Sequence, residues 1–181
     1  ANIRYLHHLG EVTYFSPLAD TSLPDTGFVY LPGGYPELYL AALSANRPML
    51  QSIRRYVENG GKLLAECGGM MYLCDEIRDK NGDVYPMAGV LHQSATMENM
   101  KLRLGYRTLL YDDARLKGHE FHYSRLVERQ DPLPSCAVAY TAKGVETDTP
   151  LYHYKNVWAG YTHLYWADPA GNDWFTKFII K

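Results

Sequence analysis

The chain has 181 residues, which is the length of one domain rather than two. Its 18 Lys and Arg against 20 Asp and Glu give a formal net charge of −2, so neither nucleic acid nor an anionic membrane surface is an expected partner. Although 46% of the residues are hydrophobic, no apolar stretch reaches the ~18 residues that a membrane-spanning helix needs. The composition therefore predicts a soluble domain without a membrane partner.

The three cysteines are too few and too unevenly spaced for a disulfide framework or a C-x-x-C metal or redox motif. The first ten residues lack the apolar core of a secretory signal, so a reducing, cytoplasmic location is expected. Ile3, Leu6 and Leu9 have helical spacing from the first residues onward, which suggests a piece of a longer protein.

Short apolar runs alternate with amphipathic stretches through the first half of the chain. A strand is predicted at 28–31, and a helix can begin at Pro36 because proline is tolerated in a first turn. A second helix is predicted at 48–61, with Leu50, Ile53 and Val57 on one face, and it ends at a Gly-Gly pair. The alternation predicts a sheet covered by helices.

The next strand is predicted at 62–66, followed by a helix at 70–77. The second half changes character, with strands predicted at 121–127, 136–142 and 157–166 between Gly, Pro and Asp turns. The C-terminal segment 172–181 is predicted to be helical.

Cys67 lies between the strand at 62–66 and the following helix, next to Gly68 and Gly69. A sharp strand-to-helix turn exposes a nucleophile, and glycines remove the side chains that would clash in the bend. The helix N-terminus favours the reactive thiolate. The alternative is a buried structural cysteine, which is the role expected for Cys74 and Cys136.

A thiol nucleophile also needs a base and donors for an oxyanion. The turn containing Gly33 and Gly34 ends one strand, and its N–H groups can form half of an oxyanion hole. His163 lies at the end of a later strand, and strand ends converge on one edge of an open sheet. Either feature alone is also compatible with an ordinary turn or a structural histidine.

The sequence resembles the glutamine amidotransferase domain of cobyrinic acid a,c-diamide synthases, a branch of the class I, triad-type amidotransferases. Five segments in the family's order carry the resemblance: YLPGGYPELY, LLAECGGMMYL, KLRLGYR, GHEFHYSRL and AGYTHLYW. It implies a flavodoxin-like α/β fold that begins after the first strand, with a mostly parallel central sheet, helices on both faces and a more antiparallel second half. Residues 1–181 would form one amidotransferase domain, the C-terminal part of a longer synthase.

The resemblance further implies glutamine hydrolysis through a thioester on Cys67. His163 would protonate the leaving ammonia, and the N–H groups of Gly68 and of Gly33 or Gly34 would hold the oxyanion. The domain itself would need no cofactor or metal, whereas ATP and magnesium would act in the N-terminal ATPase domain, its partner. The isolated chain has no G-x-x-x-x-G-K-[ST] motif and should not make the diamide. Association into a homodimer stays open.

This chain departs from the usual G-x-C-x-G-x-Q motif, because Met71 stands where the Gln is expected. By resemblance, Met71, Tyr123 and Ser124 would bind glutamine. The usual His-x-Glu is also absent, since Leu164 and Tyr165 follow His163. Either a backbone carbonyl or another side chain orients the imidazole, with Glu120 and Asp168 as candidates, or the site works as a Cys/His dyad.

His119, Glu120 and His122 suggest a metal cluster at first sight, but the two histidines would point to opposite faces of a strand. Four other functions stay open. Two belong to the same branch, a cobyric acid synthase and an amidase of a nickel tetrapyrrole. The others are a cysteine hydrolase with the same elbow and a non-catalytic docking domain.

Overall fold

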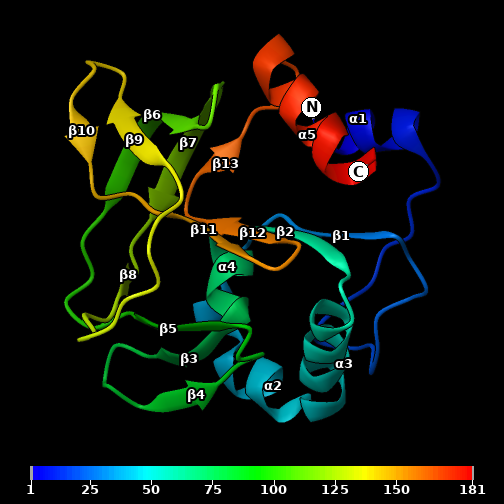
Figure 1. Ribbon diagram of the computed structural model, residues 1–181. Coiled ribbons are helices and arrows are strands. Elements are labelled where there is room, and N and C mark those ends of the chain that lie inside the picture. Colours follow the sequence, from blue (N-terminus) through cyan, green and yellow to red (C-terminus); the bar gives the residue numbers. More distant parts are fainter. Residues whose placement is uncertain (1, 181) are drawn as a thin grey trace.

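The computed structural model describes residues 2–180, apart from the side chains of 179 and 180 (Figure 1). Its helices are α1 (Asn2–Leu9), the 3₁₀ turn η1 (Pro36–Leu38), α2 (Leu40–Ala45), α3 (Arg47–Glu58), α4 (Gly68–Leu73) and α5 (Pro169–Ile180). Its strands in the first half are β1 (Phe28–Leu31), β2 (Lys62–Glu66), β3 (Cys74–Arg78), β4 (Val84–Pro86) and β5 (Leu91–Thr96). Those of the second half are β6 (Arg103–Tyr111), β7 (Ala114–His122), β8 (Arg125–Leu126), β9 (Val138–Thr141), β10 (Glu146–Thr147), β11 (Leu151–Tyr154), β12 (Val157–Gly160) and β13 (His163–Leu164).

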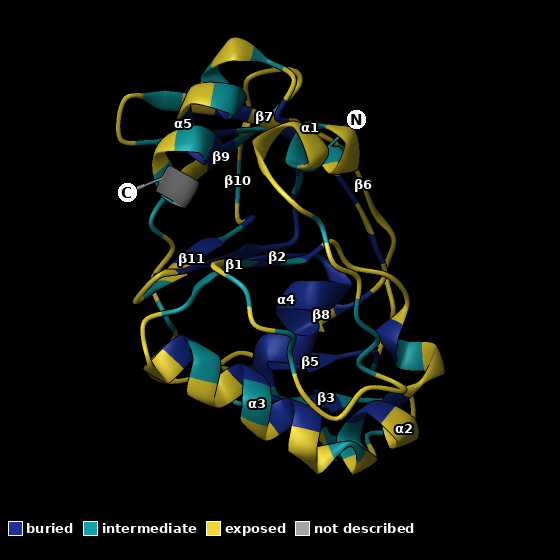
Figure 2. Ribbon diagram, turned by 90° about the vertical axis from the view of Figure 1, so that its right-hand side faces the viewer, coloured by how far each residue is buried: buried dark blue, intermediate teal, exposed yellow. Residues whose placement is uncertain are grey.

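The central sheet has the strand order β1-β2-β12-β11, in which the first three strands are parallel and β11 is antiparallel. Helices α2, α3 and α4 cover one face, and α5 with α1 covers the other (Figures 1 and 2). Buried parallel strands need apolar residues on both faces. β2 meets this need, because Leu63 and Ala65 belong to the core on the α3 side whereas Leu64 belongs to the core beneath α5.

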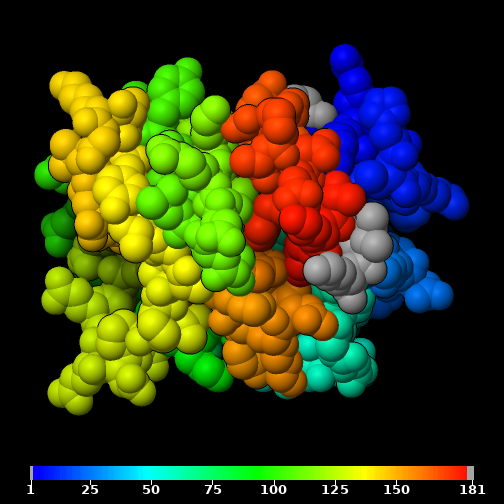
Figure 3. Space-filling model, turned by 45° about the horizontal axis from the view of Figure 1, so that its top comes forward, coloured from blue at the N-terminus to red at the C-terminus, as the bar shows by residue number. Residues whose placement is uncertain are grey.

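Two smaller sheets flank the central one. The order β10-β9-β6-β7-β13 is antiparallel throughout, and β4-β3-β5-β8 contains one parallel pair, β3 with β5. The space-filling view shows the red α5 between the green hairpin of β6 and β7 and the blue α1 (Figure 3). The antiparallel character predicted for the second half is therefore confirmed.

Several predicted elements are confirmed. The strand at 28–31 is β1, and the helix around Leu50, Ile53 and Val57 is α3, with all three side chains buried. The C-terminal helix is α5, and the N-terminal helix is α1.

The helix predicted at 70–77 is wrong beyond Leu73. Cys74 takes an extended conformation, φ −62° and ψ 170°, and begins β3, which pairs with β4 and β5. Cys74 is fully buried as predicted, but Cys136 is only half-buried and precedes β9. The strand at 157–166 is two strands, because the chain leaves the central sheet after Gly160 and joins β7 at His163. Among the described residues, no helix is long and apolar enough to cross a membrane.

Candidate active site

Cys67 occupies a strained turn between β2 and α4. Its backbone has φ 50° and ψ −112°, an unusual conformation for a residue with a side chain. The Cys67 N–H donates to the carbonyl of Gly160 at 2.8 Å, and its own carbonyl accepts from the Met71 N–H at 3.0 Å. A Cβ at Gly69 would overlap the carbonyl oxygen of Leu31, so the tight turn requires glycine there. This is the geometry of a nucleophile elbow.

The thiol is less exposed than the elbow predicts, because Cys67 is only 6% exposed. The end of β7 covers the sulfur, which lies 3.9 Å from the carbonyl oxygen of Phe121. Cys67 nevertheless lines a pocket, so the thiol can meet a ligand from one side. The expectation of a freely exposed thiol is therefore wrong: the thiol is buried and lines a pocket.

His163 reaches the elbow from β13. Strand β13 pairs with β7, so His163 lies opposite His119, and their rings stack with centroids 5.1 Å apart. Contacts with Cys67 and with Glu66 raise the pKa of His163 to about 10, against the opposing effect of burial. The structure thus brings together Cys67 and His163, although they lie on different sheets.

Glu66, the last residue of β2, also faces the imidazole and was not predicted from the sequence. Its Oε2 lies 3.5 Å from His163 Nδ1, a long separation for a hydrogen bond but within the range of an ion pair. The two expected candidates are engaged elsewhere and this expectation is wrong: Glu120 pairs with Arg107 at 2.8 Å, and Asp168 pairs with Lys117 at 3.1 Å. A carboxylate at the end of an otherwise apolar strand was the available signal.

The glycine turn after β1 packs against the elbow. Gly33 has φ +101°, and a Cβ there would lie 3.2 Å from His163 Cε1 and 3.3 Å from the Gly68 nitrogen. Gly34 has φ +141°, and a Cβ on Gly68 would lie 3.2 Å from the Gly34 nitrogen. The backbones of Gly33, Gly34 and Gly68 therefore meet beside Cys67.

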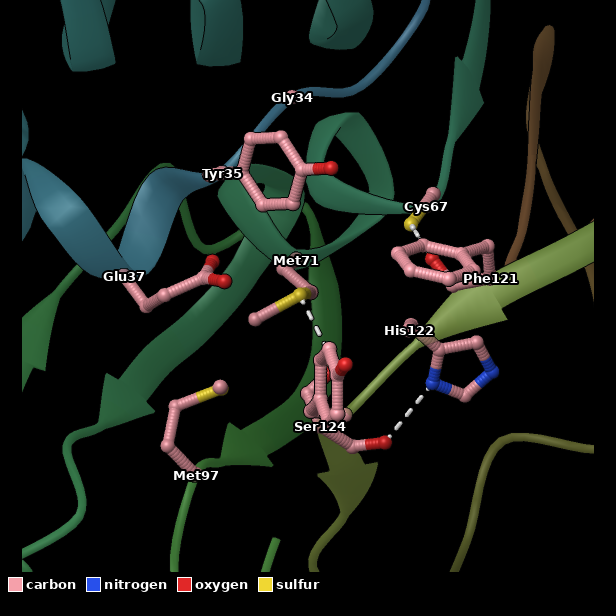
Figure 4. A pocket seen from close by; sticks show the side chains of 10 residues that line it. Gly34, Tyr35, Glu37, Cys67, Met71, Met97, Phe121, His122 and Ser124 are labelled. Carbon is pink, nitrogen blue, oxygen red and sulfur yellow. Dashed lines mark hydrogen bonds between the residues drawn. The ribbon is translucent and has the colours of Figure 1, made fainter. Parts of the chain in front are cut away.

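A small cavity of about 20 Å³ opens beside the thiol (Figure 4). It has room for a single water, so a larger ligand must displace the rings at its rim, of which Tyr35 is 58% and Tyr123 41% exposed. The cavity is lined by Gly34, Tyr35, Glu37, Cys67, Met71, Met97, Phe121, His122, Tyr123 and Ser124. The three residues expected to bind glutamine, Met71, Tyr123 and Ser124, are all among them.

Ser124 is buried and its hydroxyl is already bonded, to Met71 Sδ at 3.2 Å and to Tyr161 Oη at 3.1 Å. Glu37 is a lining residue that the sequence analysis missed, and Figure 4 shows its carboxylate directed into the space beside Met71. Burial raises the pKa of the Glu37 carboxyl, opposed by a backbone hydrogen bond. Glu37 is the one carboxylate among these lining residues.

His119 and His122 point to opposite faces of β7, as predicted, since His119 is exposed and His122 is buried. His122 stacks on Tyr161, with centroids 3.7 Å apart, and its Nδ1 lies 2.9 Å from the Ser124 carbonyl oxygen. Within residues 2–180, no group of three side chains has the arrangement of a metal site.

The fold and the site together are those of an α/β protein built around a cysteine nucleophile elbow. The chain belongs to the family of CobB/CobQ-like glutamine amidotransferase domains, whose profile matches residues 1–171. The resemblance found in the sequence is therefore confirmed.

Named relatives agree with the family assignment. The chain is 39% identical over 171 residues to hydrogenobyrinate a,c-diamide synthase of Pseudomonas aeruginosa and 39% identical over 170 residues to cobyrinate a,c-diamide synthase of Fusobacterium nucleatum. Each match covers 91% of this chain but only 38% of the relative, so most of each relative lies outside the matched region.

A crystal structure of a glutamine amidotransferase superposes with a TM-score of 0.54 over 84% of this chain and 79% of the other, at 16% identity. That likeness concerns the fold. It confirms the predicted α/β class I amidotransferase architecture, here with a short parallel sheet and two mixed or antiparallel neighbours.

Proposed function

We propose that this domain hydrolyses glutamine and supplies the ammonia with which a cobyrinate a,c-diamide synthase amidates corrin carboxylates. Family membership and the a,c-diamide synthase relatives support the activity and the acceptor. In this proposal, the ATP- and magnesium-dependent activation of the carboxylates takes place in an N-terminal domain of the full-length synthase.

The observation that carries the proposal is the contact between His163 and Cys67, beside which three glycine backbones meet. An imidazolium next to a thiol stabilises the thiolate, which is the nucleophilic form. In this proposal the N–H groups of Gly68 and of Gly33 or Gly34, whose backbones meet at the elbow, hold the oxyanion that forms on an attacked carbonyl.

The reaction follows from these groups. The Cys67 thiolate attacks the side-chain amide carbon of glutamine, and the electron pair of the C=O bond moves to the oxygen, which the backbone N–H groups stabilise. His163 gives its proton to the amide nitrogen as the C–N bond breaks, which releases ammonia and leaves a glutamyl thioester. His163 then takes a proton from water, whose oxygen displaces the sulfur, and glutamate is released. Loss of one oxyanion donor typically costs ~3 kcal/mol of barrier.

Glutamine recognition is assigned to the pocket beside the thiol. Tyr123 and the backbone near Ser124 form one wall, and Met71 forms the floor where related motifs carry a Gln. Among the residues that line the pocket, Glu37 carries the carboxylate, whose charge is complementary to the α-ammonium of glutamine. Partly desolvated charges attract more strongly than exposed ones, so this contact contributes to selection of an amino acid over a simple amide.

The test is covalent labelling with 6-diazo-5-oxo-L-norleucine, an electrophilic glutamine analogue, followed by peptide mapping. We expect the label on Cys67, protection by excess glutamine and no label in Cys67→Ser. Cys74, which is fully buried, is the internal control. A label elsewhere, or none, would overturn the proposal and favour a docking domain. A label on Cys67 that glutamine does not prevent would instead favour a general cysteine hydrolase.

A further inference from the structure

We propose that Glu66 is the positioning residue of His163 and that the hydroxyl of Tyr30 fixes Glu66 in place. The inference rests on the proposed function, because it supplies the carboxylate that the His-x-Glu position of this chain lacks. Here that carboxylate comes from the residue immediately before the nucleophile rather than from the strand that carries the imidazole.

Three contacts from two elements, β1 and β13, meet at Glu66. The Tyr30 hydroxyl of β1 donates to Oε2 at 2.7 Å, and the Leu164 N–H of β13 donates to Oε1 at 3.1 Å. His163 Nδ1 lies 3.5 Å from the same Oε2 that Tyr30 holds. Both carboxylate oxygens are thus bonded, and one of them faces the imidazole.

The backbone fixes where this carboxylate lies. Side chains alternate along β2, so Glu66 shares a face with Leu64, and its backbone lies opposite Gly160 of β12. Glu66 is 1% exposed. A buried carboxylate without partners is strongly unfavourable, so the contacts with Tyr30, Leu164 and His163 stabilise it where it stands.

The contact has a direct consequence for the imidazole. A ring held through Nδ1 keeps its proton on that nitrogen and presents Nε2 to the thiol, which is the tautomer a cysteine base needs. Burial and the Glu66 charge both raise the pKa of the Tyr30 hydroxyl, so it stays a protonated donor through the whole working pH range. Tyr30 therefore does not lose its hydrogen bond to Glu66 through ionisation of the hydroxyl.

Three titratable groups face His163: Cys67, Glu66 and His119. Burial, followed by the charge of His163, lowers the pKa of His119. The Cys67 and Glu66 contacts both raise the pKa of His163. Removal of the Glu66 charge should therefore lower the pKa of His163 and weaken its support of the thiolate.

The experiment is the pH dependence of Cys67 alkylation by iodoacetamide, read at the Cys67 peptide by mass spectrometry. We expect Glu66→Gln to move the midpoint of this profile upward, because His163 then loses its proton at a lower pH and no longer stabilises the thiolate. Glu66→Asp should recover part of the shift. The matched control is Glu120→Gln, which also removes a buried carboxylate, one that pairs with Arg107, and should leave the midpoint unchanged.

An unchanged profile in Glu66→Gln, or an equal shift in Glu120→Gln, overturns the inference. If Glu66→Gln does not fold, Tyr30→Phe decides, because it removes only the hydroxyl: an upward shift supports the inference and an unchanged midpoint rejects it. Iodoacetamide reads the thiol without glutamine. A shifted profile in a protein that the diazo-norleucine does not label would thus refute the proposed function and leave the positioning role standing.

Discussion

Gly33→Ala adds one methyl group at the point where the glycine turn, the elbow and the imidazole meet. Gly33 has φ +101°, which L side chains rarely adopt, and the added Cβ would lie 2.8 Å from the carbonyl oxygen of Glu66 and 3.2 Å from His163 Cε1. The 2.8 Å contact is with backbone and cannot be relieved by a rotamer change. Either β2 or the glycine turn must move, and the imidazole must move with it.

Two costs add for Gly33→Ala. The backbone conformation costs about 1–3 kcal/mol for a residue with a side chain, and overpacking costs about 1–3 kcal/mol more. We expect a loss of about 2–6 kcal/mol in the free energy of unfolding, measured by urea denaturation, and at least tenfold slower labelling of Cys67 by the diazo-norleucine.

Gly144→Ala is the matched control for Gly33→Ala. Gly144 also has positive φ, +74°, but a Cβ there meets nothing within 4 Å. Only the conformational cost of about 1–2 kcal/mol applies, and labelling should be unaffected. The prediction is refuted if Gly33→Ala is as stable as Gly144→Ala and its Cys67 is labelled at the wild-type rate. Close packing of the glycine turn against the site would then not be the reason that position 33 requires glycine.

Three further predictions concern the pocket and the imidazole. Cys67→Ser should abolish glutamine hydrolysis while its far-ultraviolet circular dichroism stays native; residual turnover would exclude a Cys67 thioester. Glu37→Gln should raise KM for glutamine several-fold and leave kcat nearly unchanged. It should not weaken inhibition by glutaramate, which lacks the α-ammonium. Equal losses of affinity for both ligands would contradict the contact between Glu37 and the α-ammonium. The pKa of His163 is raised from 6.5 to about 10, so its contribution to stability is complete below pH 6.5 and is lost as the pH rises through 10. Urea denaturation between pH 6 and 10 should show this decline in the wild type and less of it in His163→Gln; parallel curves would refute it.

The local signals in the sequence predicted the central layer well. The four-residue apolar run at 28–31 and the amphipathic spacing of Leu50, Ile53 and Val57 suffice, because burial on one or two faces dictates both patterns. The helix predicted beyond Leu73 is wrong because the local pattern there does not distinguish a helix from a strand. Short apolar runs are compatible with a buried helix or a buried strand, and the pairing of β3 with β5, which lies outside any local window, decides for the strand.

The site divides in a similar way. Cys67 and the glycines were predicted because an elbow restricts its own residues locally. His163 was chosen from its place at a strand end, although its strand pairs with β7 rather than continuing the central sheet. Glu37 was not found, since nothing near it in the sequence indicates that a 3₁₀ turn directs its carboxylate toward a pocket formed by β7 and α4.

Glu66 shows how a missing motif residue can be replaced by geometry. The usual His-x-Glu places the carboxylate on the strand of the imidazole. Here the imidazole lies on the two-residue β13, because the chain leaves the central sheet after Gly160 and then pairs with β7. The end of β2 then lies beside β13, so a side chain one residue before the nucleophile comes within 3.5 Å of the imidazole. The period of two along β2 already directs Glu66 away from Ala65 and toward the face of Leu64. A charged residue there must find partners, and Tyr30 of β1, which lies opposite Leu64 in the sheet register, provides one through its hydroxyl.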